Sequence, residues 1–559
     1  MATPSSSQAT LSGNCSSTPL PASPSSLSSP PSEATPLLLH SDPTQSTANV
    51  THTDSAATLC WTTGPTDESN LDDPRALRRA VKEEVTWLTV SGLSMIITYL
   101  CEYSFFFVNV VVLGQLGPKA LGAASLALTT NGCVNYGPSV GYAGALDTFC
   151  STAFTASSDK RVVGFHLQRG LFAAVLHYCI TFPFFWNFEW ILVTARQDPE
   201  IARLCGQFMR VFLFGALPWM LFECLKRFLQ AQGDMKTSTK LLVFIAPLHA
   251  AITYLLVLSP WFGLGYVGSP LACCVTNWLM LSILIIYISR SKAREAWGGF
   301  DYRCVYGISK FYKVALPSAV MVCCSWWAFE GLTIGASYLG STSLAAQSVV
   351  VSASAMAAQM PLGMSATVGT RVGNMLGAGR SRTAKLTAKA GHAVSTAFLL
   401  VTMSAIIGAS SWWGTLFTSD PEVIHIVAVT FPILAFTHAL DTFNLVNLSV
   451  FRAMGRQRIG AMISIPPFYV VMVPLGAYLA FSSLDMGVPG LWTGLLISMI
   501  IIVVGQFIFV FGYIDWDREV VACLERLKKS TRINSQPLKL NVEQLENGES
   551  GLSVTRSEC

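Results

Sequence analysis

The chain has 559 residues, of which 52% are hydrophobic and only 12% are charged, and its formal net charge is +4. Soluble globular proteins carry about 25% charged residues, so this composition excludes a soluble enzyme, a nucleic-acid-binding protein and a disulfide-stapled secreted module. Most of the surface must face lipid, and we expect an all-α polytopic membrane protein.

The N-terminal segment, residues 1–84, is expected to be a cytosolic arm. Its first 74 residues contain no Lys or Arg and are rich in Ser, Thr and Pro. Such a segment cannot bury enough apolar surface to offset the entropy of ordering, which predicts disorder. It also lacks the basic and apolar regions of a signal peptide.

Twelve later stretches are long and apolar enough to cross a bilayer as helices, because a hydrocarbon core about 30 Å thick needs about 20 residues. They fall near residues 86–113, 121–146, 165–193, 206–226, 241–260, 266–288, 312–338, 345–367, 387–416, 423–450, 460–481 and 489–513. We expect six of them in an N-lobe over 85–289 and six in a C-lobe over 311–514. Residues 290–310 are then a cytosolic linker, and residues 515–559 a cytosolic tail.

Basic residues are concentrated in alternate loops. The other set of loops carries only Lys119, Arg196 and Arg203, or no base at all. The clustered bases are Lys160, Arg161, Lys226, Arg227, Lys236, Arg290, Lys292, Arg294, Arg380, Arg382, Lys385, Arg452, Arg456 and Arg458. By the positive-inside rule, this asymmetry places both termini in the cytosol.

The two halves of the chain resemble each other. LGPKALGAASL, which begins at Leu116, matches LGSTSLAAQSV, which begins at Leu339, at an offset of 223 residues, and Pro138 matches Pro361 at the same offset. Two further pairs match at an offset of 222, LQAQG with FRAMG and GYVG with GVPG. Because each half has an even number of spans, the repeat is parallel, and transporters commonly bind substrate between such halves. Chance similarity among apolar helices is the alternative.

Two acids lie inside spans of the second half. Glu330 is near the middle of the seventh span, and Asp441 lies in the tenth, three residues after His438 on the same helix face. A carboxylate inside a span costs at least about 2.5 kcal/mol, and desolvation favours the protonated form of a carboxyl group in general. These three residues are the candidate proton- or cation-coupling residues. The alternative is a set of structural acids bonded to Ser, Asn or backbone groups.

Polar residues also lie inside spans of the first half. Glu102 is in the middle of the first span, with Asn109 two turns later on the same face, and both are candidate cavity residues. Glu223, in the fourth span, is close to Lys226 and Arg227. This spacing predicts an ion pair near the cytosolic edge of the membrane.

Aromatic and amide side chains near the two acids are candidate contacts in a substrate cavity, because aromatic faces attract organic cations. They are Trp326, Trp327, Phe329, Tyr338 and Asn444. Packing inside the helix bundle is the alternative for each of them.

Motifs for other chemistry are missing from the sequence. There is no GxxxxGK[ST] loop and no Gly-rich dinucleotide fingerprint, so transport would have to run on an ion gradient rather than on ATP. The 15 cysteines form no CxxC pair, which predicts neither a zinc site nor a disulfide framework. We therefore expect neither an enzyme nor a cofactor or metal.

Five phrases occur in order along the chain. They are GALDTFCSTAFTA from Gly144, RFLQAQG from Arg227, WWAFE from Trp326, GTRVGNMLGAG from Gly369 and FRAMGRQRIGA from Phe451. Together they resemble the eukaryotic branch of the multidrug and toxic compound extrusion (MATE) transporters, over about residues 85–514. The motif residues with expected structural roles are Asp147, Gln230, Arg371, Asn374, Gly377 and Gly379.

This resemblance implies a twelve-helix, V-shaped carrier of the MATE/MOP fold. It would act as a monomer in the bilayer and export small organic cations or amphipathic toxins in exchange for protons or, less favoured, sodium ions. The resemblance also implies that Glu330 and Asp441 are the cation-handling pair. Bacterial relatives often carry an acid in a phrase resembling VDTIxxG, where this chain reads VNVVVLG with Asn109, and this puts a first-lobe site of that type in doubt.

Other functions are disfavoured on particular grounds. A lipid-linked precursor flippase of the same superfamily should line its cavity with Arg or Lys, whereas this chain puts acids in its spans. A major-facilitator carrier would carry GxxxDRxGRR after the second span, where this chain reads SSDKRVVG. A receptor or scaffold would leave the duplication and the mid-span acids unexplained.

A short pattern in the N-terminal arm bears on location. Glu33 lies four residues before the pair Leu37 and Leu38, an arrangement that resembles the acidic dileucine signals read by cytosolic sorting adaptors. It favours the vacuolar membrane. A chance Leu run, with location in the plasma membrane, is the alternative.

Overall fold

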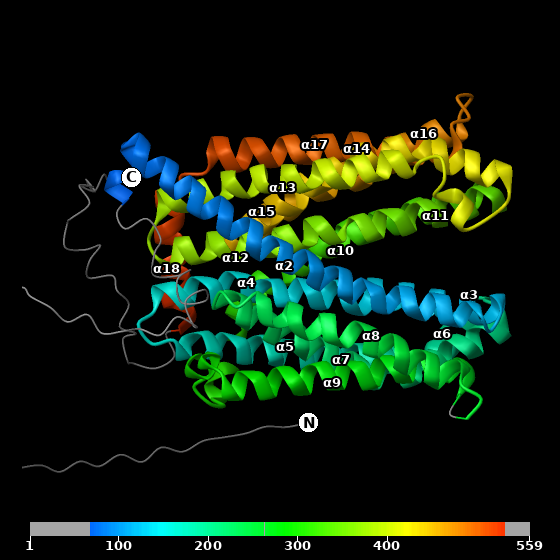
Figure 1. Ribbon diagram of the computed structural model, residues 1–559, viewed down its shortest axis with the longest axis horizontal. Helices are drawn as coiled ribbons and strands as arrows, with labels where there is room; N and C mark the ends of the chain where they lie inside the picture. The colour runs from blue at the N-terminus through cyan, green and yellow to red at the C-terminus, as the bar shows by residue number, and fades with distance from the viewer. Residues whose placement is uncertain (1–67, 262, 532–559) are drawn as a thin grey trace, which may run out of the picture. The chain divides into compact units, whose positions relative to one another are not determined.

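The computed structural model describes residues 68–261 and 263–531 (Figure 1). These residues lie in the second of the two units into which the chain divides, Asp54–Cys559. Within the described ranges the backbone forms helices joined by short loops, and it forms no strand. This confirms the expected all-α fold class. The dileucine pattern lies outside the described residues.

The first half forms the N-lobe. Its α-helices are α2 (Pro74–Gly114), α3 (Pro118–Asn131), α4 (Gly137–Ala156), α5 (Arg161–Trp186), α6 (Phe188–Thr194), α7 (Pro199–Ala231), α8 (Lys236–Leu258) and α9 (Gly268–Arg290). Its shorter turns are η1 (Glu68–Asp72), the π-helical η2 (Gly132–Tyr136) and η3 (Gly265–Val267). The turns η4 (Lys292–Ala296) and η5 (Tyr302–Cys304) follow and lead to the second half.

The second half forms the C-lobe. Its α-helices are α10 (Ile308–Tyr338), α11 (Ser341–Ala357), α12 (Gln359–Gly377), α13 (Ser381–Ala409), α14 (Pro421–Met454), α15 (Gln457–Pro466), α16 (Val473–Phe481) and α17 (Gly487–Phe507). Its shorter turns are η6 (Gly414–Leu416) and the π-helical η7 (Pro467–Met472) and η8 (Ile508–Tyr513). One more helix, α18 (Trp516–Thr531), follows the C-lobe.

Ten helices of the described chain are long and apolar enough to cross a membrane, and the bent pair α5 and α6, which meet at 55°, makes an eleventh span. The expected span at 121–146 is not among them, although α3, η2 and α4 form one unbroken helical run. This run carries Thr129, Thr130, Asn131 and Asn135, and most of α4 is buried. It is less apolar because it packs against protein, where small and polar residues suit close helix contacts.

Helical structure is also present outside the expected spans, before the first one and after the last one. α2 begins at Pro74, where the Asp73 carboxylate accepts a hydrogen bond from the Arg75 amide (3.1 Å), although the arm was expected to run to residue 84. The start of α2 is helical because Ala80 and Glu84 are buried there. The expected polar tail likewise begins with a helix, α18, which has acids in its first turn and Lys in its last, as a helix dipole favours.

The lobes cross each other in two equivalent places. α2 packs on α12, and α4 packs on α10. In the repeat, α2 corresponds to α10 and α4 corresponds to α12. The contact of α2 with α12 is therefore the counterpart of the contact of α10 with α4. In one crossing Gly141 lies against the backbone of Ala319, and in the other Gly363 lies against the backbone of Ile96. These are matching positions at offsets of 222 and 223, which confirms the parallel repeat.

Glycines in left-handed conformations mark the same turns in both lobes. Gly117 has φ 109° and Gly340 has φ 108°, and each precedes the second helix of its lobe. Gly265 and Gly487 agree as well, with φ 60° and 57°. A side chain is strained at such φ values, so these turns explain why glycine recurs at the two offsets.

The buried core is shared by the lobes at only one end. One apolar cluster combines Leu88 and Leu146 of the N-lobe with Val372 of the C-lobe and Leu524 of α18. Two other clusters each lie within a single lobe, near the opposite ends of the helices. We call the shared end, which carries α18 and the start of α2, the termini end, and the opposite one the far end; the termini end is at the left of Figure 1.

Candidate transport site

Glu330 lies on α10 at the crossing of α10 and η2. Its side chain is half-buried, and no hydrogen bond or ion pair reaches it from the described residues. Its carboxylate is within electrostatic reach of the Cys133 thiol in η2. The neighbouring Trp327 donates a hydrogen bond from its indole nitrogen to the carbonyl of Cys133 (3.3 Å). Glu330 therefore lies where the two lobes face each other.

Asp441 begins a polar chain inside the C-lobe. Its carboxylate accepts a hydrogen bond from Asn444 Nδ2 (3.3 Å), and Asn444 Oδ1 accepts one from Gln506 Nε2 (2.9 Å) on α17. Both amides are buried, and Gln506 Oε1 has no hydrogen-bond partner in the described chain. Sequence reasoning missed Gln506; the signal was a single amide within the apolar run IIIVVGQFIF.

His438 does not contact Asp441 in the described structure. Its Nε2 lies 2.9 Å from the hydroxyl of Thr402 on α13, and its side chain is buried. A second histidine, His392 of α13, contacts the helix of Asp441: it stacks on Phe443 and shares a hydrogen bond with Asn447 (3.0 Å). Sequence reasoning missed His392 because it considered only residues on the helix of Asp441.

The N-lobe contains a buried ion triad. Lys226 Nζ is fully buried and pairs with Glu102 (2.6 Å) and with Glu223 three residues before it. Its ammonium also lies over the ring of Tyr99, 4.8 Å from the centroid. The predicted pairing of Glu223 with Lys226 is confirmed, whereas Arg227 pairs elsewhere. Glu102 and Glu223 therefore share a basic partner that belongs to the same lobe.

Asn109 belongs to a buried network on the N-lobe side. It donates to the carbonyl of Phe105 (2.7 Å), accepts from the hydroxyl of Ser269 (2.6 Å) and lies 3.4 Å from His249. Because these bonds occupy both its carbonyl oxygen and its amide, Asn109 is a packing residue in this conformation.

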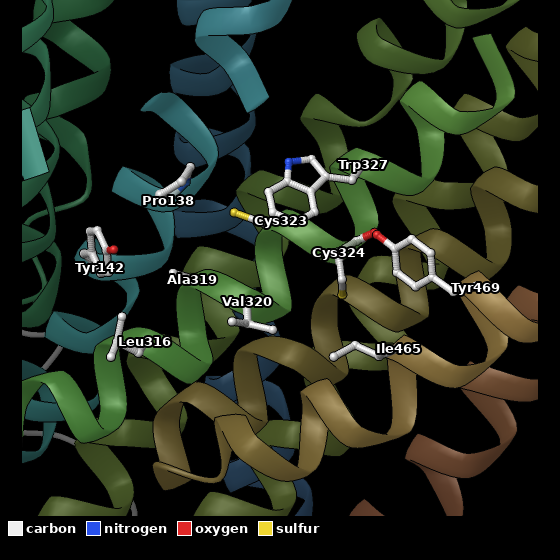
Figure 2. A pocket seen from close by; sticks show the side chains of 10 residues that line it. All are labelled: Pro138, Tyr142, Leu316, Ala319, Val320, Cys323, Cys324, Trp327, Ile465 and Tyr469. Atoms are coloured by element: carbon white, nitrogen blue, oxygen red, sulfur yellow. The ribbon is translucent and has the colours of Figure 1, made fainter. Parts of the chain in front are cut away.

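The predicted cavity aromatics have different environments. Trp326 and Trp327 are 36% and 52% exposed, and Tyr338, at the end of α10, is 80% exposed. Phe329 instead packs against Trp492, with ring centroids 6.2 Å apart. Among them, only Trp327 lines the cavity of about 490 Å³ between α4, α10 and the α15–η7 segment (Figure 2).

That cavity is largely apolar. It is lined by Pro138, Tyr142, Leu316, Ala319, Val320, Cys323, Cys324, Trp327, Ile465 and Tyr469. The polar atoms of two of its rings are already bonded, because Tyr469 donates to the carbonyl of Cys324 (3.1 Å) and Trp327 to that of Cys133. It contains neither Glu330 nor Asp441.

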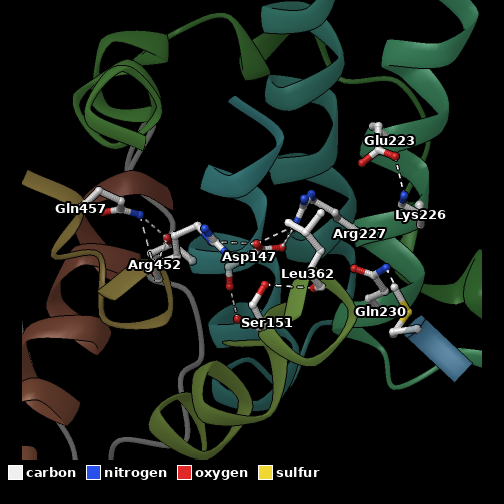
Figure 3. A network of polar contacts seen from close by, with 12 residues as sticks. Asp147, Ser151, Glu223, Lys226, Arg227, Gln230, Leu362, Arg452 and Gln457 are labelled. Carbon is white, nitrogen blue, oxygen red and sulfur yellow. Dashed lines mark hydrogen bonds and ion pairs between the residues drawn. The ribbon is translucent and has the colours of Figure 1, made fainter. Parts of the chain in front are cut away.

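Two of the motif residues, Asp147 and Gln230, are among the polar side chains of Figure 3. Asp147 accepts two hydrogen bonds from Arg227 Nη1 (2.6 and 2.8 Å) and lies 3.5 Å from Nε of Arg452, which belongs to the C-lobe. Next to it, the Thr148 hydroxyl donates to the carbonyl of Arg452 (2.5 Å) and accepts from Gln457 (2.8 Å). This is a buried ionic contact between the lobes.

A second ionic contact joins α2 to α12. Arg371 donates through Nε and Nη2 to the carboxylate of Glu84 (2.5–3.2 Å), which also accepts a bond from Thr387 (3.0 Å). Arg371 lies over the ring of Trp87, 4.8 Å from its centroid. Two of the predicted motif residues, Asp147 and Arg371, therefore hold the lobes together.

Asn374 and Gly377 lie at the contact between α4 and α12, whereas Gln230 lies inside the N-lobe. The Thr155 hydroxyl of α4 donates to the backbone carbonyl of Asn374 (2.7 Å), and a Cβ at Gly377 would lie 2.9 Å from Cα of Thr152. Gly379, two residues after the end of α12, has φ 76°. Gln230 lies on the seam between α7 and α2, where its amide is 3.5 Å from Sδ of Met95. The close approach of α4 and α12 explains the small residues in both motifs.

Comparison with known proteins agrees with this architecture. The family model MatE matches residues 94–255 and 317–478, two segments at the offset of the internal repeat. The chain belongs to the MatE family. It is therefore a transporter of the multidrug and toxic compound extrusion type, as the sequence motifs had indicated.

Its relatives in this family cover most of the chain. An uncharacterized transporter of Schizosaccharomyces pombe is 34% identical over 78% of this chain and 81% of its own length. Protein DETOXIFICATION 16 of Arabidopsis thaliana is 32% identical over 82% and 93%, respectively. The crystal structure of the eukaryotic MATE transporter AtDTX14 aligns with a TM-score of 0.75 and 25% identity, covering 80% of this chain and 99% of that one.

A second family model, Lipid II flippase MurJ, matches residues 191–343. This segment begins late in the N-lobe and ends early in the C-lobe, so it does not follow the repeat. The MatE model matches both halves of the chain.

Proposed function

We propose that this MatE-family transporter is a proton antiporter that exports small organic cations or amphipathic toxins. The observation that carries the proposal is a difference among the acids within the helices. Glu84, Glu102, Glu223 and Asp147 each pair with a Lys or Arg. In the described chain, Glu330 and Asp441 have no basic partner.

An acid without a base can exchange its counter-ion. A carboxylate that already faces a lysine gains little from a second cation, whereas an unpaired one in a low-dielectric site must bind a proton or another positive charge. Proton and cationic substrate then compete for Glu330 and Asp441, and this competition couples the two flows. Sodium coupling is the less favoured alternative.

The side chains around Glu330 suit an organic cation. Trp326 and Trp327 lie four and three residues before it in the chain and are partly exposed, and Phe329 precedes it directly. Aromatic faces attract cations by about 0.5–2 kcal/mol. We propose that these rings hold the apolar body of the substrate and that Asn444 orients Asp441.

The proposed orientation rests on the loop charges, and the proposed location rests on the dileucine pattern. We propose that the termini end is cytosolic, that residues 290–310 and the segment after residue 515 are cytosolic as well, and that the vacuolar membrane is the site of action. A fluorescent C-terminal fusion tests the location. If Leu37→Ala with Leu38→Ala leaves a vacuolar signal unchanged, the dileucine argument fails.

A lipid-linked precursor flippase is the second candidate, favoured by the MurJ match. Such a carrier needs free bases for a pyrophosphate group. The buried Lys226, Arg227 and Arg371 are each bonded to an acid. This charge arrangement favours the cation exporter.

The test is transport by purified protein in proteoliposomes with an imposed pH gradient, read with a cationic dye. Glu330→Gln is expected to abolish gradient-driven dye movement. The matched control is Glu189→Gln, because Glu189 is an acid that pairs with Arg210 (2.9 Å) away from the proposed site. Wild-type gradient dependence in Glu330→Gln would overturn the mechanism, and a response to a sodium gradient alone would select the alternative.

A further inference from the structure

The helix α18 lies across the termini end, where the two lobes meet (Figure 1). It packs on α4 of the N-lobe and on α12 and α13 of the C-lobe. The sequence shows only a polar tail in this region. In the structure, α18 forms part of the contact between the lobes.

The first three turns of α18 are attached to the C-lobe. Glu519 accepts hydrogen bonds from Nε and Nη2 of Arg456 (3.0 and 2.5 Å). Asp517 bonds to the hydroxyl of Ser381 at the start of α13, and Arg526 donates to the carbonyl of Met454 (2.8 Å). The hydrogen bonds and the negative charge of Glu519 raise the pKa of Arg456 above its ordinary value.

The last turn of α18 reaches the N-lobe. Arg169 of α5 donates through Nη1 to the carbonyl of Ser530 (3.0 Å), and its other nitrogens donate to the carbonyls of Cys304 (3.1 Å) and Tyr306 (3.0 Å). Arg169 is 1% exposed and has no acid partner in the described chain. The last carbonyls of a helix lack partners inside the helix, and a cation there is favoured by the dipole.

The apolar face of α18 joins the core that both lobes share. Val520, Cys523, Leu524 and Leu527 are at most 8% exposed and belong to the same cluster as residues of both lobes. Separation of the lobes at this end would uncover part of that face. Burial of this face therefore favours the state in which the lobes are together.

We propose that α18 is a clasp that holds the termini end closed, and that this end opens only when the last turn of α18 leaves Arg169. The first turns stay on the C-lobe, because most of the polar bonds of α18 are made there. The clasp thus sets the balance between the two faces of the carrier. The inference rests on the proposed function only in assuming that the lobes separate at this end during transport.

The test compares two shortened chains. A chain ending at Thr531 keeps all of α18. One ending at Leu527 loses the Ser530 carbonyl with its bond to Arg169, and also the Lys529 carbonyl with its bond from Lys310 of α10 (2.6 Å). Arg169→Gln in the full-length chain is therefore measured beside it to isolate the bond to the N-lobe. All of these chains carry Thr155→Cys, a reporter at the contact of α4 with Asn374 of α12. Its reaction with a maleimide is followed by peptide mass spectrometry, which separates it from the native cysteines. Neither substrate nor gradient is needed, so failure here leaves the coupling mechanism untouched.

We expect the reporter to react at least about threefold faster in the chain that ends at Leu527, because a weakened closed state is open more often. Equal rates in the two chains would overturn the proposal. If the shorter chain does not elute as a folded protein in gel filtration, Arg169→Gln in the full-length chain alone carries the comparison. Its control is Arg161→Gln, an exposed arginine at the start of the same helix, and equal labelling of these two variants would also overturn the clasp.

Discussion

The two lobes have the same helical scaffold but differ in whether the acids inside their spans have a basic partner. In the N-lobe, Glu102 and Glu223 both pair with Lys226, so each of these acids has a basic partner. In the C-lobe, Asp441 bonds only to an amide, and Glu330 has no partner among the described residues. The duplicated scaffold therefore contains paired mid-span acids in one lobe and unpaired ones in the other.

The difference is present residue by residue. At the repeat offsets, Glu330 corresponds to Phe107, Asp441 to Trp219, and Lys226 to Leu448. Each lobe thus carries charge where its counterpart carries an apolar side chain. This teaches that the backbone of the repeat does not determine the chemistry, and that the lobe whose mid-span acids have no basic partner is the one suited to exchange cations.

Removing the base of the N-lobe should cause the largest change. Lys226→Met leaves two acids buried without a counter-ion, and breaking such a buried pair costs about 3–5 kcal/mol. We expect a marked fall in the unfolding temperature, measured by tryptophan fluorescence in detergent. The control adds Glu102→Gln and Glu223→Gln to Lys226→Met, and most of the stability should return. A wild-type unfolding temperature for Lys226→Met alone would show that the triad is not holding the lobe.

Giving the C-lobe a base should abolish the difference between the lobes. Asn444→Lys places an ammonium three residues after Asp441, the spacing of Glu223 and Lys226. We expect gradient-driven export to fall at least about 30-fold, which is about 2 kcal/mol of lost coupling. The control is Asn444→Met, which has a similar shape without charge and should transport better. Equal activity of the two variants would argue against competition for Asp441.

The fold and the short-range contacts were largely predictable from the sequence. Span length, the repeat and the glycine turns depend on local pattern, and the structure agrees with them. The ion pair of Glu223 with Lys226 also follows from a spacing of three residues on a helix. The span at 121–146 was expected from its length and apolar content. The structure has a helical run there, α3, η2 and α4, but this run is not among the described helices apolar enough to cross a membrane.

Long-range contacts were not predictable in the same way. Arg371 bonds to Glu84, which is 287 residues away in the chain, and Asp147 bonds to Arg227 and Arg452 from different helices. Such pairs depend on how the lobes cross. The motif phrases marked Asp147 and Arg371 as structural, but nothing in their spacing named these partners. α18 was missed because only one of its faces is apolar, and the helices that cover this face are distant in the sequence.

The smallest effect is expected at His438, and it tests how local the C-lobe site is. Its position three residues before Asp441 suggested a shared role in coupling, but its ring bonds to Thr402 on another helix (2.9 Å). His438→Gln can keep that bond through its amide, so we expect export to stay within about threefold of wild type, as for a substitution that keeps its hydrogen bond. The pH dependence of export should also be unchanged, because no titrating group at the coupling acids is altered. Export is measured in proteoliposomes from pH 5.5 to 8, with His438→Leu as the variant that loses the bond. A displaced pH profile in His438→Gln would show that this histidine takes part in coupling and that the coupling site includes its contact with α13.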